Sequence, residues 1–86
     1  MFVTSSGNYN VTSIRLDRGD TLTIIYSQPR SGEVRTRFTS LNGSPAVASL
    51  TVDNEFTSRS RVFSSAGSWR YKADDHSGNS GTIVVE

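Results

Sequence analysis

Cysteine is absent from the 86-residue sequence, and histidine, methionine and lysine each occur once. Without cysteine the chain forms no disulfide and offers no thiolate, either as a metal ligand or as a nucleophile. Its one histidine, His76, leaves no second imidazole for a site that needs two. These absences exclude disulfide stabilisation and thiol chemistry, and they severely restrict metal-centred and nucleophilic catalysis.

Long apolar segments are also absent. No run approaches the roughly 18 apolar residues that a transmembrane helix needs. The first three residues, Met-Phe-Val, lead directly into a polar stretch instead of the apolar core of a signal peptide. We therefore expect no membrane segment and no export signal, although the sequence does not say whether Met1 is the native start. The expected location is a virion if the structural interpretation below holds, and the cytoplasm otherwise.

The size and composition of the chain predict one small domain spanning residues 1–86. Only 34% of the residues are hydrophobic, which predicts a thin core that gains stability by docking on a partner. The formal net charge of +1 predicts no strong affinity for nucleic acid. Arginine, which is enriched at protein interfaces where lysine is depleted, outnumbers lysine eight to one. A compositional bias of the genome is the alternative explanation.

Serine and threonine supply 24 of the 86 residues, a composition that suits strands and turns better than helices. Apolar and polar residues alternate in many short segments, and none shows a sustained 3.6-residue period. Turn sequences, such as residues 17–20 and Asn-Gly-Ser-Pro at 42–45, separate these segments. We predict an all-β fold, an antiparallel Greek-key β-sandwich of seven to eight short strands. The expected strands are residues 2–4, 11–16, 21–26, 33–39, 46–52, 55–63, 68–73 and 81–86.

Residues 62–86 carry a family resemblance. Segment 66–72 reads Ala-Gly-Ser-Trp-Arg-Tyr-Lys, and it is followed by His76, Gly81 and a β-branched last strand. This resembles the C-terminal end of the cupredoxins, small blue-copper β-sandwich proteins, and residues 18–24 are similar to an earlier strand of that family. The resemblance implies the fold, with an immunoglobulin-like strand order as the alternative. It also places Ala73 at the thiolate ligand and Asn79 at the axial methionine, so it does not imply copper binding.

Other chemistry is sparse. Asp74, Asp75 and Asn79 could supply oxygens to a hard cation, as could Asp17 and Asp20 in another loop, but their spacing matches no EF-hand loop and such residues usually cap turns. Serines near His76 are too common in this chain to indicate a catalytic pair. We predict no catalytic residues, no metal ligands and no cofactor, and therefore no enzyme.

One surface is a candidate binding site. In a Greek-key sandwich the strands at 33–39 and 68–73 would be neighbours, with Val34, Thr36 and Phe38 pointing inward. The side chains that alternate with the apolar residues would then share an outward face, and the aromatic residues would point into the core. This arrangement favours a protein partner with an acidic or mixed-charge surface over nucleic acid, which needs exposed stacking aromatics. The alternative is an ordinary solvated sheet surface. The predicted partner-binding residues are Arg35, Arg37, Arg70 and Lys72.

These features together predict a non-catalytic structural or interaction module. The specific expectation is a small accessory protein of a larger assembly, such as a decoration or cement protein on a phage capsid, with self-association also considered. One alternative is a metal- or small-ligand-binding domain derived from a copper protein, which would reuse the loop Asp74-Asp75-His76. Another is an adhesion or carbohydrate-binding domain.

Overall fold

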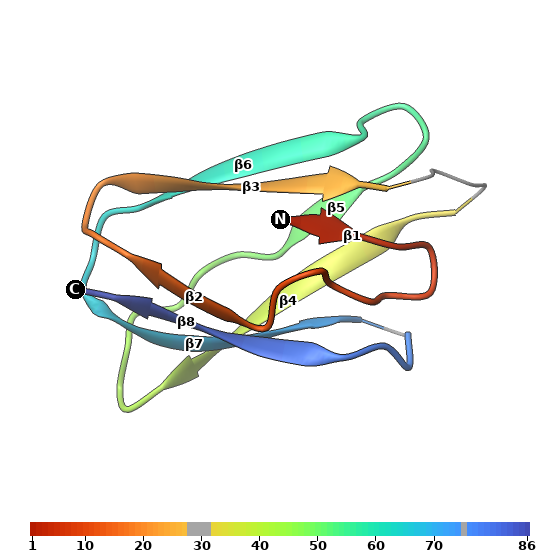
Figure 1. The fold of residues 1–86 in the computed structure, drawn as a ribbon. Helices are drawn as coiled ribbons and strands as arrows, with labels where there is room; N and C mark the ends of the chain where they lie inside the picture. Colours follow the sequence, from red (N-terminus) through yellow and green to blue (C-terminus); the bar gives the residue numbers. More distant parts are fainter. Residues whose placement is uncertain (28–31, 75) are drawn as a thin grey trace.

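In the described part of the chain, eight strands form two sheets that pack face to face (Figure 1). The computed structural model describes residues 1–27, 32–74 and 76–86. One sheet has three strands in the order β1-β3-β6, and the other has five in the order β2-β8-β7-β4-β5. No helix among these described residues has the length and apolar character that crossing a bilayer requires. The strands are β1 (Phe2–Val3), β2 (Ser13–Leu16), β3 (Asp20–Tyr26), β4 (Val34–Leu41), β5 (Leu50–Val52), β6 (Ser58–Phe63), β7 (Gly67–Ala73) and β8 (Ser80–Val85).

The predicted all-β sandwich is confirmed, and its pairing is mostly antiparallel. Four neighbouring pairs run antiparallel: β3 with β6, β4 with β5, β4 with β7, and β7 with β8. The two N-terminal strands differ, because β1 pairs in parallel with β3 and β2 pairs in parallel with β8. The chain therefore crosses from one sheet to the other between β1 and β2. Parallel neighbours require such crossovers, since a tight hairpin can join only antiparallel strands.

The core lies between the sheets, where alternate residues of the strands meet. Trp69 and Tyr71 of β7 are fully buried, together with Ile24 of β3 and Ile83 of β8. Phe63 packs with its ring edge-on to Trp69, at 5.4 Å between centroids. The inward direction predicted for residues 34, 36 and 38 is confirmed, since all three are buried. The same alternation directs the charged side chains of β4 and β7 outward.

The turn predicted at residues 42–45 is confirmed. Asn42 and Gly43 have φ angles of 54° and 74°, in the left-handed region that asparagine and glycine tolerate best. Two consecutive residues with positive φ are characteristic of the tight turns that reverse a strand. This turn ends β4 and sends the chain across the end of the sandwich.

The prediction for residues 46–52 is wrong in its first half. Only Leu50–Val52 forms a strand, and residues 46–49, the crossing segment, lead from β4 to β5 of the same sheet without strand pairing. Ala46 and Ala48 are exposed, whereas Val47 is partly buried against the core. The alternation therefore runs opposite to the prediction here, because burying valine removes more apolar surface from water than burying alanine.

Candidate functional site

The first candidate region is the loop after β7, where the cupredoxin resemblance places the copper ligands. Ala73 is buried, and its Cβ lies against Gly7 from the N-terminal loop. A Cβ added to Gly7 would lie 2.8 Å from the Cβ of Ala73 and 2.6 Å from that of His76. Gly7 also has a φ angle of 84°, which disfavours any other residue. The N-terminal loop thus packs directly on the segment that would carry the ligands.

Asn79 joins the two loops through its side-chain amide. Its Oδ1 accepts a 2.7 Å hydrogen bond from the main-chain nitrogen of Tyr9, and its Nδ2 donates to the Tyr9 carbonyl oxygen at 3.1 Å. The main-chain nitrogen of Asn79 donates in turn to Asn8 Oδ1 at 3.1 Å. We call the pair of side-chain contacts the Asn79–Tyr9 bridge. It occupies both ends of the amide at the position where the resemblance places an axial methionine.

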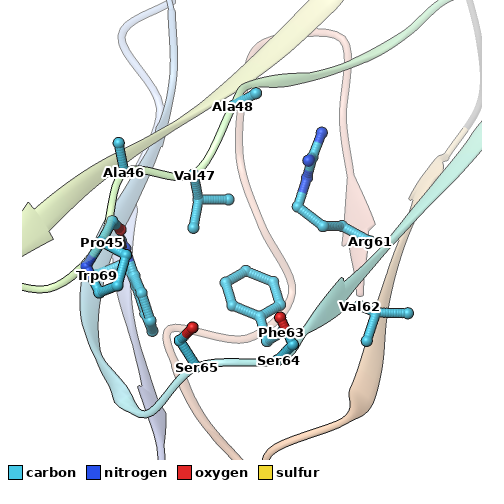
Figure 2. Close-up of a pocket in the computed structure, with 10 residues that line it drawn as sticks. All are labelled: Pro45, Ala46, Val47, Ala48, Arg61, Val62, Phe63, Ser64, Ser65 and Trp69. Carbon is cyan, nitrogen blue, oxygen red and sulfur yellow. Dashed lines mark hydrogen bonds between the residues drawn. The ribbon is translucent and has the colours of Figure 1, made fainter.

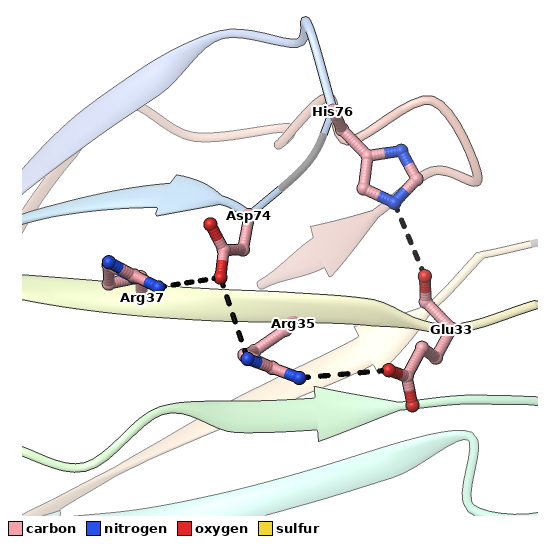
Figure 3. A network of polar contacts seen from close by, with 5 residues as sticks. All are labelled: Glu33, Arg35, Arg37, Asp74 and His76. Carbon is pink, nitrogen blue, oxygen red and sulfur yellow. Dashed lines mark hydrogen bonds and ion pairs between the residues drawn. The ribbon is translucent and has the colours of Figure 1, made fainter.

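His76 also makes an internal contact. Its Nε2 lies 3.2 Å from the carbonyl oxygen of Glu33, and because a carbonyl only accepts, the ring nitrogen donates (Figure 3). In the described part of the chain, no group of three or more histidine, cysteine, aspartate or glutamate side chains gathers in metal-binding geometry. Asp75, the middle residue of the predicted ion loop, lies outside the described residues. In the other predicted loop, Asp20 Oδ2 accepts from the main-chain nitrogen of Asp17 at 2.9 Å, which is ordinary turn capping.

Two buried tyrosines lie in this region, Tyr9 in the N-terminal loop and Tyr71 in β7. The hydroxyls of Tyr9 and Thr36 are 2.8 Å apart, and Tyr71 donates a 2.6 Å hydrogen bond to the carbonyl oxygen of Val11. Burial raises the pKa of Tyr9 above its usual value, although the Thr36 contact opposes the shift. Burial, with a smaller contribution from Tyr9, raises the pKa of Tyr71 to about 12. Both phenols are therefore protonated at neutral pH, and they serve as hydrogen-bonding packing groups.

The second candidate region is the predicted partner-binding surface, and the structure brings its residues together. β4 and β7 are hydrogen-bonded neighbours, with Arg37 directly opposite Lys72 and Thr39 directly opposite Arg70. All four predicted cations are exposed and lie on the outward side of the five-stranded sheet. We call this surface, formed by Arg35, Arg37, Arg70 and Lys72, the basic face. Its role in binding stays a prediction.

Asp74 organises one end of the basic face (Figure 3). Its Oδ2 accepts a 2.8 Å hydrogen bond from Arg37 Nη2 and lies 3.6 Å from Arg35 Nη1. Glu33 lies 4.0 Å from Arg35 and adds a second, weaker ion pair. Among the described residues, two carboxylates thus accompany the four cations. Arg37, Arg70, Lys72 and Asp74 are among the residues that line a shallow hollow of about 160 Å³ on this face.

The remaining charge of the basic face is less well compensated. Within the described residues, Arg70 has no ion pair, and Lys72 Nζ contacts a carbonyl oxygen, that of His76, at 3.1 Å. Like charges placed directly opposite on neighbouring strands, as Arg37 and Lys72 are, destabilise a sheet. An acidic surface laid on this face would relieve that repulsion.

The aromatic residues of the same strands point the other way. Phe38, Trp69 and Tyr71 are buried between the sheets, as the alternation predicted. The basic face therefore offers no exposed aromatic ring on which a nucleobase could stack. Its neighbours on β8 and β5 are Thr82, Ser80 and Thr51. The surface is cationic and hydroxyl-rich, which is chemistry suited to carboxylates.

Similarity to known proteins was found by comparing structures and not by comparing sequences. No protein-family model matches the sequence, and no curated protein matches it. Solved structures do match. A reduced Cu(I) form of one amicyanin variant is 23% identical with a TM-score of 0.70, a second Cu(I) variant is 23% identical with a TM-score of 0.71, and an oxidised variant is 24% identical with a TM-score of 0.70. Each alignment covers 100% of this chain and 81% of the amicyanin chain.

The fold is cupredoxin-like. The resemblance noted in residues 62–86 therefore extends over the whole chain at the level of fold. The residues present do not fit a blue-copper site, which needs two histidines and a cysteine thiolate. Ala73 supplies no thiolate, and the amide of Asn79 is bonded at both ends to Tyr9. This cupredoxin-like chain keeps the sandwich and lacks the ligand chemistry.

Sequence reasoning missed the partners of the ligand-position loop. Gly7, Asn8 and Tyr9 come from the N-terminal loop, about 70 residues away from Asn79. The only local signal was the turn sequence around Gly7, which indicates a bend and says nothing about what packs on it.

Proposed function

We propose that this chain is a non-catalytic protein-interaction module that docks on an acidic protein surface through its basic face. The observation that carries the proposal is the alignment of Arg37 with Lys72, beside an Arg70 that has no ion pair in the described residues. Complementary charge across an interface gives specificity and speeds association. Arginine supports such contacts well, because its planar fork binds carboxylates with two parallel hydrogen bonds.

The loop after β7 supports the same conclusion, because its residues argue against the alternative function of metal binding. Among the described residues, the groups that would have to bind a metal there already have partners: His76 donates to Glu33, Asp74 binds two arginines, and Asn79 binds Tyr9. Recruiting them would break several contacts that hold loops of the fold together. Arg70 and Lys72 of the basic face have no ion pair in the described residues, so these two cations break none when they bind a partner.

The finer part of the proposal concerns the kind of assembly. A small sandwich with a thin hydrophobic core gains apparent stability when it binds a partner that recognises only the folded state. A decoration or cement protein on a phage capsid would work in this way, with the basic face against acidic side chains of the shell. What supports this setting is fold-level analogy together with the basic face. A virion location belongs to this proposal.

The test is binding of decaglutamate, a defined acidic probe, by isothermal titration calorimetry at low ionic strength. We expect the wild type to bind, and the double variant Arg70→Ser/Lys72→Ser to raise Kd by at least about tenfold, which corresponds to about 1.4 kcal/mol. The control Arg18→Ser removes one charge from the turn between β2 and β3, away from the basic face, and should change Kd by less than about threefold, whereas the single variant Arg70→Ser should weaken binding more. Added salt should weaken wild-type binding. Equal losses in Arg18→Ser and Arg70→Ser would leave only net charge as the cause and would refute the proposal.

A further inference from the structure

A groove that shares no lining residue with the basic face lies between β6 and the crossing segment that precedes β5. Its volume is about 360 Å³ (Figure 2). Val47 projects from the crossing segment toward Phe63 of β6, and Trp69 closes one end. Arg61 projects from β6 into the space between the two walls. The lining residues are Pro45, Ala46, Val47, Ala48, Arg61, Val62, Phe63, Ser64, Ser65 and Trp69.

One wall of the groove is the free edge of a sheet. β6 is the last strand of its sheet, and it pairs only with β3 among the described strands. The main-chain nitrogen of Tyr26 donates to the Thr57 carbonyl oxygen at 2.7 Å, which fixes the hydrogen-bonded register. Residues 57, 59 and 61 therefore bond toward β3, whereas Ser58, Ser60 and Val62 direct their N–H and C=O groups away from it. These outward groups are the ones that an additional strand would use.

The other wall also has free main-chain groups. Residues 46–49 belong to no strand, and no main-chain hydrogen bond reaches them from the described part of the chain. The Pro45 carbonyl oxygen, at the start of this wall, accepts a 2.8 Å hydrogen bond from Trp69 Nε1. The crossing segment is thereby held against Trp69 at its start.

The charge of the edge strand is unbalanced. Arg59 and Arg61 are opposite Ile24 and Leu22 of β3, so their side chains start on the inner face of the sheet. Arg61 Nε is buried and has no hydrogen-bond partner in the described chain, and neither arginine forms an ion pair there. Arg59 lies over the ring of Phe56, at 4.4 Å from Cζ to the centroid. A buried donor without a partner is unfavourable until a carboxylate or water satisfies it.

We propose that β6 and this groove bind an extended segment of an acidic partner protein, which adds to the sheet as an antiparallel strand. Its main chain would bond to Ser58, Ser60 and Val62. An acidic side chain would lie opposite Arg61, and an apolar side chain two residues away, on the same face, would lie opposite Phe63 in the groove. This site is separate from the basic face and goes beyond the function proposed above.

A second copy of this chain is a poorer occupant. In an antiparallel β6–β6 pair centred on Ser60, Arg59 of one copy would lie directly opposite Arg61 of the other, twice over. Like charges in that position repel, and arginines that point inward from an edge strand are a recognised protection against edge-to-edge pairing. The same arginines attract a strand that carries carboxylates.

The test uses a blocked heptapeptide, Thr-Val-Thr-Asp-Thr-Asp-Thr, whose antiparallel register sets valine opposite Phe63 and the two aspartates opposite Arg61 and Arg59. Binding to the full chain is measured by fluorescence of the single tryptophan, Trp69, which lines the groove. We expect saturable binding, and at least about tenfold weaker binding of three probes: the asparagine analogue, the reversed sequence, and the peptide N-methylated at its third and fifth residues. Equal binding of the N-methylated peptide would overturn strand addition, and equal binding of the asparagine analogue would overturn acidic recognition.

Two protein variants test the same edge. Ser60→Pro removes one outward N–H without removing a hydrogen bond to β3, and Ser60→Ala is its matched control, because both lose the 2.8 Å contact with Thr23 Oγ1. We expect Ser60→Pro, but not Ser60→Ala, to weaken peptide binding at least about tenfold. The variant Arg70→Ser/Lys72→Ser should leave Kd for the heptapeptide unchanged, so failure here is distinguishable from failure of the basic-face proposal. A peptide-free dimer that Ser60→Pro dissociates would overturn the proposal in favour of self-association.

Discussion

At position 79, one side-chain amide connects the first ten residues of the chain to the last ten. The Asn79–Tyr9 bridge contains two hydrogen bonds, both partly buried. Replacing Asn79 by alanine leaves the N–H and C=O of Tyr9 without those partners. We expect Asn79→Ala to lower the free energy of unfolding by about 1–3 kcal/mol, as measured by urea denaturation. The control is Asn54→Ala, which changes an exposed asparagine whose side chain has no hydrogen bond to the described residues, and it should change stability by less than about 0.5 kcal/mol. Similar losses in the two variants would mean that the bridge contributes nothing.

Tyr71 gives the protein a specific response to alkaline pH. Its pKa is raised to about 12 in the folded state, from 10.0 when exposed. Between these values the unfolded chain releases the phenolic proton while the folded chain retains it, so stability falls as pH rises from about 10 toward about 12. Urea denaturation at increasing pH should show this fall in the wild type and a smaller one in Tyr71→Phe. At neutral pH the same variant should lose about 1 kcal/mol with the Val11 contact. An identical pH profile in both proteins would assign the effect to other groups.

At the scale of elements, most strands could be predicted because alternation reports which face of a strand is buried. β3, β4 and β7 alternate cleanly, and their inward residues form much of the core. The crossing segment at 46–49 could not be predicted, because alanines carry little information about burial and the segment follows the gap between the sheets. The parallel pairing of β1 with β3 and of β2 with β8 was also not predicted, because pairing between distant strands leaves no local signal in the sequence.

The close packing of the two loops predicts a strong effect at Gly78. A Cβ added there would lie 2.1 Å from the carbonyl oxygen of Gly7, a main-chain atom that cannot move without displacing the N-terminal loop. We expect Gly78→Ala to destabilise the fold by at least about 2 kcal/mol in thermal or urea unfolding. Gly43→Ala is the comparison: it has positive φ but open space around it, so only backbone strain of about 1 kcal/mol is expected. A smaller effect at Gly78 than at Gly43 would contradict the packing described here.

At the scale of the whole molecule, the two candidate binding sites differ in how far the sequence could reveal them. The basic face could be predicted, because it required only that β4 and β7 be neighbours and that their alternation hold. The groove beside β6 could not, since it arises where a crossing segment of one sheet passes the edge of the other. The composition alone shows that the copper ligands are absent, because there is no cysteine and only one histidine. The contacts now made at those positions, between Asn79 and Tyr9 and between Ala73 and Gly7, could be identified only from the structure.

The central claim, that the outward surface of β4 and β7 is where this cupredoxin-like module meets a partner, is tested most directly by an amide NMR titration of ¹⁵N-labelled protein with decaglutamate. The account predicts that the largest saturable shifts cluster at Arg35, Arg37, Arg70 and Lys72 and on their strand neighbours, and that they shrink as salt is added. Shifts confined to the loop around His76 and Asn79, or shifts spread evenly over every arginine, would contradict it.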